Sequence, residues 1–390
     1  MHLGFVSYEY PPDTGQGGIA TYVQQVSAAL AGLNVEVDVF VGSPKRFGVE
    51  RLRPNYRIHY IQCNSREEFI NLSPEQVRIV HGIMPFEGVE CPEYGAEATF
   101  MRTVLPEVRI WVKLHTPAYL VKKLNDHYYD RRIWRRIKHL LHPYQKEKDP
   151  EYLALRKADR VIAPCESMRA IAIRDWGLEP DRVWTVPNPY QPAAAFTEIE
   201  LPSGAPTAIY VGRLETRKGV WNLAKAIPLV LREIPNARFL FLGKDSQGPR
   251  RERSMKKCML RALGRAARSV EFIDAVSLAQ VPSILERASV AVFPSLWENF
   301  PNVCLEAMAS GRAIIASKEG GMIDMLTPSQ GGIFIDPNDP QDIANALIEL
   351  FTHPDRIRQM GERNRHRAIQ YYGKELVREL FDTYRKLCFH

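Results

Sequence analysis

The second half of the chain opens with a strand–loop–helix–strand pattern in residues 208–242, AIYVGRLETRKGVWNLAKAIPLVLREIPNARFLFL. Residues 208–211 are a short apolar run of the buried-strand type, and a loop between two glycines follows over 212–219. Residues 220–231 have the apolar spacing of a helix, and residues 239–242 are apolar again. This order predicts a βαβ unit with parallel strands.

The same order occurs at the start of the chain. Residues 3–6 are an apolar run, residues 19–33 have helical spacing, and residues 35–41 are rich in β-branched side chains. Between the two βαβ patterns, residues 186–192 and 201–206 are rich in residues that break helices and strands, with five prolines and one glycine. We therefore expect two domains, each able to bury a core, with the linker in this region.

Further strands are expected at 290–293 and 313–316, with a helix between them over 302–310 that Gly311 ends. Such units belong to doubly wound parallel sheets. In these sheets ligands bind beyond the carboxyl ends of the strands, so functional residues are expected there.

Composition excludes several classes of protein. The chain has 390 residues, 45% hydrophobic and 25% charged, so it is not disordered, collagen-like or a small disulfide scaffold. No run reaches the roughly 20 apolar residues of a membrane span, and no signal peptide is visible, so we expect a cytoplasmic location. The six cysteines are scattered and never form C-x-x-C, which predicts reduced thiols and no structural zinc.

The net charge of +7 is concentrated in two segments. Residues 122–148 carry +6 and residues 244–268 carry +7, so the rest of the chain sums to −6. This pattern suggests local contact with an anionic lipid surface or a phosphate, and it fits nucleic-acid binding less well. A basic, non-catalytic membrane-surface adaptor is therefore one alternative function.

Each basic segment also contains an apolar stripe at helical spacing. Ile133, Trp134 and Ile137 interleave with arginines in the first segment, and the second stripe is Met255, Met259, Leu263 and Ala266. The competing interpretation is a basic helix that packs on its own domain.

Two glutamates flank the start of the helix expected at Asn302. Glu298 precedes it in a loop, and Glu306 lies about one turn inside it. The free amides near Asn302 and Val303, at the positive end of the helix dipole, would suit a phosphate. The alternative is a capped helix with two solvated acids.

The glycine-bracketed loop 212–219 supplies a second candidate anion site. It can bring Arg213 and Lys218 to one point, where a guanidinium and an ammonium would neutralise a diphosphate. An exposed basic turn is the alternative interpretation.

Taken together, these motifs resemble the retaining glycosyltransferases of family 4 over nearly the whole chain. Those enzymes have the α/β GT-B fold, in which two Rossmann-like doubly wound domains face each other across a cleft. The residues that carry the resemblance are Gly212-Arg213, Lys218-Gly219, Glu298 to Glu306 with the following Ala307-Met308-Ala309-Ser310-Gly311, Gly17-Gly18, His115 and Ala158 to Pro164.

The resemblance implies a domain arrangement. A final helix, Lys374 to Leu387, would cross back onto the N-terminal domain. The N-terminal, acceptor-side domain would then comprise residues 1–190 together with helix 373–390. Residues 191–372 would bind the nucleotide-sugar donor.

The resemblance also implies roles for residues of the donor domain. Arg213 and Lys218 would bind the donor's diphosphate and stabilise it as a leaving group, with contacts from Asn302 and Val303. Glu298 would hold hydroxyls of the transferred sugar, near the Asn299 and Phe300 backbones. Glu306 would accept hydrogen bonds from the ribose hydroxyls.

In the N-terminal domain, Gly17 and Gly18 would let the backbone approach the diphosphate where a Cβ would intrude. His115 follows the apolar run 110–114 and would lie beside the donor sugar. His81 has no matching motif and is expected to be structural.

Similar enzymes retain the anomeric configuration, and a front-face substitution without a protein nucleophile is usually proposed for them. Electrostatic stabilisation of the leaving group then supplies much of the catalysis. The sequence has no D-x-D, so we expect metal-independent activity with no cofactor. UDP-glucose is the expected donor, and the acceptor is expected to be a saccharide or a lipid-linked saccharide in bacterial exopolysaccharide or envelope synthesis.

Three departures from the family pattern limit this transfer of roles. Asp324 stands where many relatives have glutamate, and Pro301, which has no N–H, replaces a frequent glycine. Residues 87–94, with Glu90 and Glu93, resemble only some bacterial relatives and are a candidate for acceptor choice.

A nicotinamide-dependent dehydrogenase is the alternative enzyme. Residues 15–20 fit G-x-G-x-x-A, and Asp38 follows at a plausible distance. A dehydrogenase would need these glycines directly after the strand, but residues 7–14 intervene.

Overall fold

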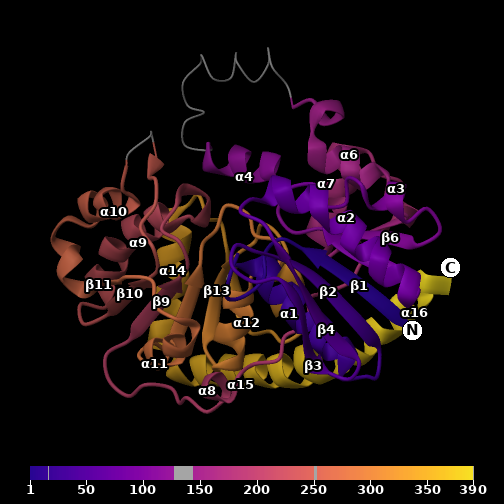
Figure 1. The fold of residues 1–390 in the computed structure, drawn as a ribbon. Coiled ribbons are helices and arrows are strands. Elements are labelled where there is room, and N and C mark those ends of the chain that lie inside the picture. The colour runs from indigo at the N-terminus through magenta and orange to yellow at the C-terminus, as the bar shows by residue number, and fades with distance from the viewer. Residues whose placement is uncertain (16, 127–143, 250–252, 390) are drawn as a thin grey trace. The chain divides into compact units, whose positions relative to one another are not determined.

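The computed structural model describes residues 1–15, 17–126, 144–249 and 253–389. Contacts between Cα atoms divide the chain into two compact units (Figure 1). Unit 1 holds the chain up to Ala118, the segment Tyr144–Gln191 and the chain from Tyr372 onward, and unit 2 holds the helix ending at Asn125 and the segment Pro192–Tyr371. The C-terminal end of the chain is therefore part of the same unit as the N-terminal end.

Unit 1 is built on an eight-stranded sheet in the order β3-β4-β2-β1-β5-β6-β7-β8. Its strands are β1 (His2–Ser7), β2 (Glu36–Ser43), β3 (Gly48–Arg53), β4 (Tyr56–Gln62), β5 (Gly88–Pro92), β6 (Arg109–Lys113), β7 (Arg160–Ala163) and β8 (Val183–Thr185). All neighbours are parallel except the β3–β4 pair. The central strand β1 is buried along its whole length, which explains its continuous apolar run.

The main helices of unit 1 are α1 (Gly18–Ala31), α2 (Arg66–Ile83), α3 (Met101–Val104), α6 (Pro150–Arg156), α7 (Glu166–Trp176) and α16 (Leu376–Phe389). Helix α1 buries the side chains at Ile19, Val23, Val26 and Leu30, which are spaced as on one helix face. It ends at Ala31, so Leu33, which the apolar spacing included, lies beyond the helix. His81 accepts a hydrogen bond at Nδ1 from the Phe86 amide, 3.0 Å away, which is a structural role.

Helix α16 is attached to unit 1 by a buried polar network. The hydroxyl of Tyr384 donates to Glu90 Oε2 at 2.5 Å, and the hydroxyl of Tyr22 on α1 donates to Glu90 Oε1 at 2.8 Å. Burial raises the pKa of Glu90 above its ordinary value, although these two hydrogen bonds and Lys113 oppose the rise. The segment before α16, Ala368–Glu375, is wound as a π-helix.

Unit 2 contains a six-stranded sheet, entirely parallel, in the order β11-β10-β9-β12-β13-β14. Its strands are β9 (Thr207–Val211), β10 (Arg238–Leu242), β11 (Val270–Ile273), β12 (Val290–Phe293), β13 (Ala313–Ser317) and β14 (Gly332–Ile335). Its helices include α4 (Ala118–Asn125), α8 (Ala194–Thr197), α9 (Val220–Glu233), α10 (Met255–Leu263), α11 (Val281–Leu285), α12 (Asn302–Ala309), α13 (Met322–Leu326), α14 (Pro340–Thr352) and α15 (Pro354–Arg367). The strands and the helix expected at 208–242 are present within two residues of their predicted limits.

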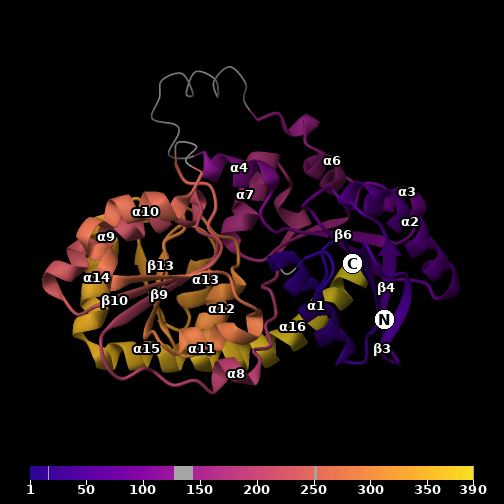
Figure 2. The same ribbon diagram turned by 60° about the vertical axis from the view of Figure 1, so that its left-hand side comes forward.

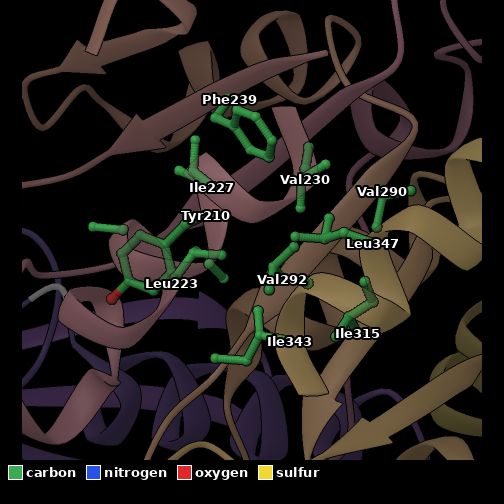
Figure 3. Packing of buried hydrophobic residues seen from close by; sticks show 14 of the residues in the cluster. Tyr210, Leu223, Ile227, Val230, Phe239, Val290, Val292, Ile315, Ile343 and Leu347 are labelled. Atoms are coloured by element: carbon green, nitrogen blue, oxygen red, sulfur yellow. The ribbon is translucent and has the colours of Figure 1, made fainter. Parts of the chain in front are cut away.

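The core of unit 2 forms where α9, α10 and α14 pack together against the sheet (Figure 2). Figure 3 shows Leu223, Ile227 and Val230 of α9 beside Val292 of β12 and Leu347 of α14. Both sheets are parallel apart from the β3–β4 pair, and helices connect most successive strands, so the predicted doubly wound α/β class is confirmed.

Candidate functional site

The loop after β9 is held in shape by its glycines and by one hydroxyl. Gly212 has φ 147° and Gly219 has φ 68°, both in the region that favours glycine. A Cβ at Gly219 would come within 1.7 Å of the Pro294 carbonyl oxygen, so only glycine fits this close approach. The Tyr210 hydroxyl donates to the Arg213 carbonyl at 2.8 Å and fixes the start of the loop.

This loop brings three cations and two carboxylates together. The Lys218 ammonium forms an ion pair with Glu298 Oε1, and Arg217 Nη1 lies 3.5 Å from the same oxygen. Arg217 Nε lies 2.9 Å from Glu215 Oε1, and Arg213 Nη2 lies 3.4 Å from that oxygen. Only Arg213 is substantially exposed in this group, with 60% of its side chain accessible. A buried charged network therefore lies at the carboxyl ends of β9 and β12.

Electrostatics in the network favour a charged Glu298. Burial opposes ionisation, but Lys218 and Arg217, with hydrogen bonds from Lys218 and Ser295, hold the pKa of Glu298 below its ordinary value. Burial lowers the pKa of Lys218, and Glu298 opposes this shift.

The Glu298 loop is also fixed by its backbone. The Gly321 amide donates to the Glu298 carbonyl at 2.9 Å, and a Cβ at Gly320 would lie 2.0 Å from that oxygen. Gly320 has φ 99°, again a glycine conformation. Asn299 and Phe300 are buried in this loop, and Asp324 lies in the first turn of α13 that follows Gly321.

Helix α12 begins at Asn302, as predicted, with Pro301 in the capping position and no side-chain cap. Among the described residues, the amides of Asn302 and Val303 have no hydrogen-bond acceptor, and the first amide bonded within this turn is Cys304, to Pro301. Exposed N–H groups at a helix start form a site for an anion.

Glu306 lies within the same helix, in an electrostatic environment that differs from that of Glu298. It is 9% exposed, and burial raises its pKa to about 7. Within the part of the chain that the structure describes, its carboxylate has no hydrogen-bond partner. A buried acid in this state is ready to accept hydrogen bonds from ligand hydroxyls.

His115 belongs to unit 1 and lies two residues after β6. Its amide donates to Glu93 Oε2 at 2.7 Å, and its ring meets that of Tyr22 edge-on at 5.5 Å. Burial, assisted by the charge of Lys113, lowers the pKa of His115 to about 3, so the imidazole is neutral near pH 7.

Gly17 and Gly18 also belong to unit 1, at the start of α1, and both are exposed. A Cβ at Gly18 would meet no atom within 4 Å, and one at Gly17 would meet only Glu9 Oε2, at 3.7 Å. Packing within unit 1 therefore does not require glycine at either position.

Family models match both halves of the chain. A model of glycosyl transferases group 1 matches residues 193–367, and a model of Glycosyltransferase Family 4 matches residues 16–193. The chain belongs to glycosyltransferase family 4.

Curated relatives and solved structures agree with this family-4 assignment. An alpha-maltose-1-phosphate synthase of Mycolicibacterium smegmatis is 26% identical over 99% of this chain and 100% of its own, and D-inositol 3-phosphate glycosyltransferase 2 of Catenulispora acidiphila is 26% identical over 96% and 91%. Sucrose-phosphate synthase from Thermosynechococcus elongatus has a TM-score of 0.73 at 22% identity, covering 99% of this chain and 98% of its own. Anabaena HepE in complex with UDP and glucose has a TM-score of 0.66 at 14% identity over 99% and 100%. The GT-B fold class expected from the sequence is confirmed.

The dehydrogenase alternative is wrong for this family-4 glycosyltransferase. Tyr8 to Thr14 separate β1 from the glycines, and Asp38 is buried within β2. Both carboxylate oxygens of Asp38 are already bonded, to His2 Nε2 at 2.6 Å, His59 Nε2 at 2.6 Å and the Arg57 guanidinium at 2.8 and 2.9 Å. These bonds leave the acid no place for a ribose hydroxyl.

The structure tests the membrane-surface interpretation for only one of the two basic segments. Residues 127–143, which hold most of the first apolar stripe, lie outside the described residues. In the second segment, Met255, Met259 and Leu263 are buried in the unit 2 core, with Ala266 packed against it. The second stripe is therefore a core face and not a membrane-facing one.

No helix among the described residues has the length and apolar character needed to cross a membrane. The six cysteines are all free thiols, and five of them are buried. Within the described ranges, no cluster of three His, Cys, Asp or Glu side chains is placed to hold a metal ion.

Sequence reasoning missed three members of the charged network in unit 2: Glu215, Arg217 and Ser295. Arg217 lies beside Lys218 in the sequence, but its partner Glu298 is far along the chain. The one available signal was the alternation of charges in Arg213-Leu214-Glu215-Thr216-Arg217-Lys218, which is unusual for a buried segment.

Proposed function

We propose that this family-4 glycosyltransferase moves glucose from UDP-glucose to a saccharide acceptor, with retention of configuration and without a metal ion. The observation that carries the proposal is the buried network of Lys218, Arg217 and Glu298 beside the uncapped start of α12. Cations and free amides at one place suit a diphosphate leaving group, and a neighbouring carboxylate suits sugar hydroxyls.

Leaving-group stabilisation would supply most of the rate enhancement. Arg213 is exposed and free to swing onto a phosphate, while Lys218 provides a compact charge from within the loop. The departing phosphate would take the acceptor's proton on the same face of the sugar. Arg213, Lys218 and the helix start would together stand in place of a metal ion.

The other residues have supporting roles in this proposal. Glu306 would accept hydrogen bonds from the ribose, and the Asn299 and Phe300 backbones would lie near the sugar. His115, neutral near pH 7, would act as a hydrogen-bonding group beside the transferred sugar and not as a cation. Gly17 and Gly18 would provide backbone contact with the diphosphate.

The donor and acceptor are proposed on different grounds. Anabaena HepE was solved with UDP and glucose, which supports UDP-glucose as the first donor to test. We propose a saccharide or lipid-linked saccharide acceptor in polysaccharide or envelope synthesis, with selectivity in residues 87–94. The names of the curated relatives point to phosphorylated acceptors, so glucose 1-phosphate and inositol 3-phosphate belong in the same panel.

The test is a transfer assay with UDP-, GDP- and ADP-sugars, in EDTA, against this acceptor panel. The expected result is turnover with UDP-glucose that EDTA leaves unchanged, and a product whose anomeric proton coupling matches that of the donor. Inversion, or activity that only a divalent ion restores, would overturn the corresponding part of the proposal.

Peripheral contact with an anionic membrane, at its cytoplasmic face, is a separate part of the proposal and now rests on segment 122–148 alone. Its test is sedimentation with anionic vesicles. We expect the wild-type protein to pellet, and the variant with Arg131, Arg132, Arg135 and Arg136 all changed to glutamine to stay in solution. A wild-type protein that does not pellet would remove the membrane contact.

A further inference from the structure

Arg217 is a buried cation to which the proposed reaction assigns no role. Only 10% of its side chain is exposed. Its backbone is held on both sides, since its amide donates to Asn125 Oδ1 at 3.2 Å and its carbonyl accepts from the Leu296 amide at 2.8 Å. From this fixed position the guanidinium faces Glu215 at 2.9 Å and Glu298 at 3.5 Å.

The buried charges of this network balance without Arg213. Two carboxylates, Glu215 and Glu298, are matched by two cations, Arg217 and Lys218, each with at most 15% of its side chain exposed. Lys218 and the Ser295 hydroxyl, at 3.0 Å, donate hydrogen bonds to the single oxygen Glu298 Oε1, and Arg217 Nη1 lies 3.5 Å from it as an ion-pair partner. Lys218 therefore already has Glu298 as an ion-pair partner.

A donor sugar changes this balance. In the proposed function Lys218 neutralises the diphosphate and Glu298 accepts hydroxyls of the sugar, so their ion pair has to loosen. A buried carboxylate that loses its counter-ion either costs several kcal/mol or takes up a proton. Glu298 therefore needs a second cation that stays in place when the lysine turns away.

We propose that Arg217 is this resident counter-ion, a positioning residue that keeps Glu298 ionised and in place while Lys218 engages the donor diphosphate. The proposal rests on the proposed donor-binding role of this site. A guanidinium suits the task because it presents several donors in one plane, can face two carboxylates at once, and does not lose its proton.

The competing explanation is that Arg217 only braces the loop. In that case, changing the side chain would lower the stability of the protein and weaken the binding of every ligand to the same extent. A counter-ion role instead predicts a change in the protonation of Glu298, which a pH profile reports.

The experiment compares Arg217→Gln, Arg217→Lys and the wild type in kcat/KM as a function of pH. In Arg217→Gln the pKa of Glu298 rises, so activity on the acid side should be lost at a pH at least about one unit higher than in the wild type. Arg217→Lys keeps a positive charge and should restore most of the profile. Arg358→Gln removes an exposed arginine of α15 and is the control for net charge.

Glu215→Gln gives an independent test of opposite sign. In this variant Arg217 has Glu298 as its only carboxylate partner in the network, so the pKa of Glu298 should fall. The acid-side loss of activity should then move to lower pH. This variant also keeps the inference testable if Arg217→Gln does not fold. Acid limbs that coincide with that of the wild type in both glutamine variants would overturn the inference.

Failure of the inference can be told from failure of the proposed function. A wild-type protein that binds and turns over no nucleotide sugar contradicts the function itself. A wild-type protein that turns over normally, with no displaced acid limb in the variants, contradicts only the role of Arg217.

Discussion

At the scale of the residue, Glu306 links burial to ligand recognition. Its carboxyl group is nearly buried, carries no cation beside it among the described residues, and has a pKa raised to about 7. Glu298 is also buried, but two cations hold its pKa low. The pKa values of these two glutamates are therefore shifted in opposite directions. This suits Glu306 to hydroxyls of a nucleoside, and the ionised Glu298 to hydroxyls of the sugar beside the charged diphosphate.

The pH dependence of nucleotide binding tests the role of Glu306. We expect affinity for a nucleoside diphosphate to fall as the pH drops through about 7, because a protonated acid accepts hydrogen bonds more weakly than a carboxylate. In Glu306→Gln the affinity above this pH should be lower by about tenfold, and the pH dependence should be reduced to that of the ligand's own terminal phosphate, which titrates at about pH 6. Calorimetric titration measures both, and a variant that keeps the wild-type pH dependence would contradict this role.

Lys218→Ala should separate turnover from binding. Because the lysine acts on charge that develops as the diphosphate leaves, we expect kcat to fall by about a hundredfold or more, and donor affinity by about tenfold or less. Steady-state kinetics and calorimetry give the two values. Lys257→Ala, on the exposed side of α10, is the matched control, and an equal loss in kcat and in affinity would speak against leaving-group stabilisation.

At the scale of the element, the site depends on turns that only glycine can make. Gly219 joins the Arg213–Lys218 loop to α9, and Gly320 supports the Glu298 loop from the end of β13. Each approaches a backbone carbonyl too closely for any Cβ. The geometry of the charged network is thus set by backbone contacts between loops that are distant in sequence.

Gly219→Ala should disrupt this geometry. The left-handed conformation costs a residue with a Cβ about 1–2 kcal/mol, and the contact with the Pro294 carbonyl adds to that cost. We expect a clear drop in the urea midpoint and loss of nucleotide binding. Gly82→Ala, at an open position in α2, should be neutral or slightly stabilising, and wild-type binding by Gly219→Ala would contradict the predicted strain.

Helix α16 should depend on its buried tyrosine. Tyr384→Phe leaves Glu90 without one hydrogen-bond donor, which should destabilise unit 1 by about 1–3 kcal/mol. The change also raises the pKa of Glu90 in the folded protein further. The loss of stability should therefore be greater in alkaline solution, where the unfolded chain has given up this proton. It should be smaller in acid solution, where Glu90 is protonated in both the folded and the unfolded chain. Chemical denaturation at several pH values measures this, with Arg385→Gln, in an exposed ion pair, as the control. Equal stability of Tyr384→Phe and wild type would show that the contact contributes nothing.

Much of the element order could be predicted because buried parallel strands appear as continuous apolar runs. The strands at 290–293 and 313–316 and the helix start at Asn302 were located in this way. Strand β3 was missed because most of its side chains are exposed, so no buried face marks it in the sequence. The role of Arg217 was missed for another reason. It depends on the ion pair with Glu298, and only the fold brings these two residues together.

At the scale of the whole molecule, the two units share one architecture but differ in chemistry. Unit 1 has a neutral His115 and three buried carboxyl groups with raised pKa values, namely Glu90, Glu93 and Glu97. Unit 2 has a balanced network of buried ions. This difference supports the proposal that the charged leaving group binds at unit 2. The family models match each unit's main segment separately.

The central claim is that unit 2 binds a nucleoside diphosphate through Glu306 and the network around Lys218. The most direct measurement is calorimetric titration of UDP, GDP and ADP into the wild type and Glu306→Ala, in EDTA, with NAD as the control ligand. The account predicts that one diphosphate, expected to be UDP, binds the wild type at least about tenfold more tightly than it binds the variant, and that NAD does not bind. Equal affinity for both proteins, or binding of NAD but of no diphosphate, would contradict it.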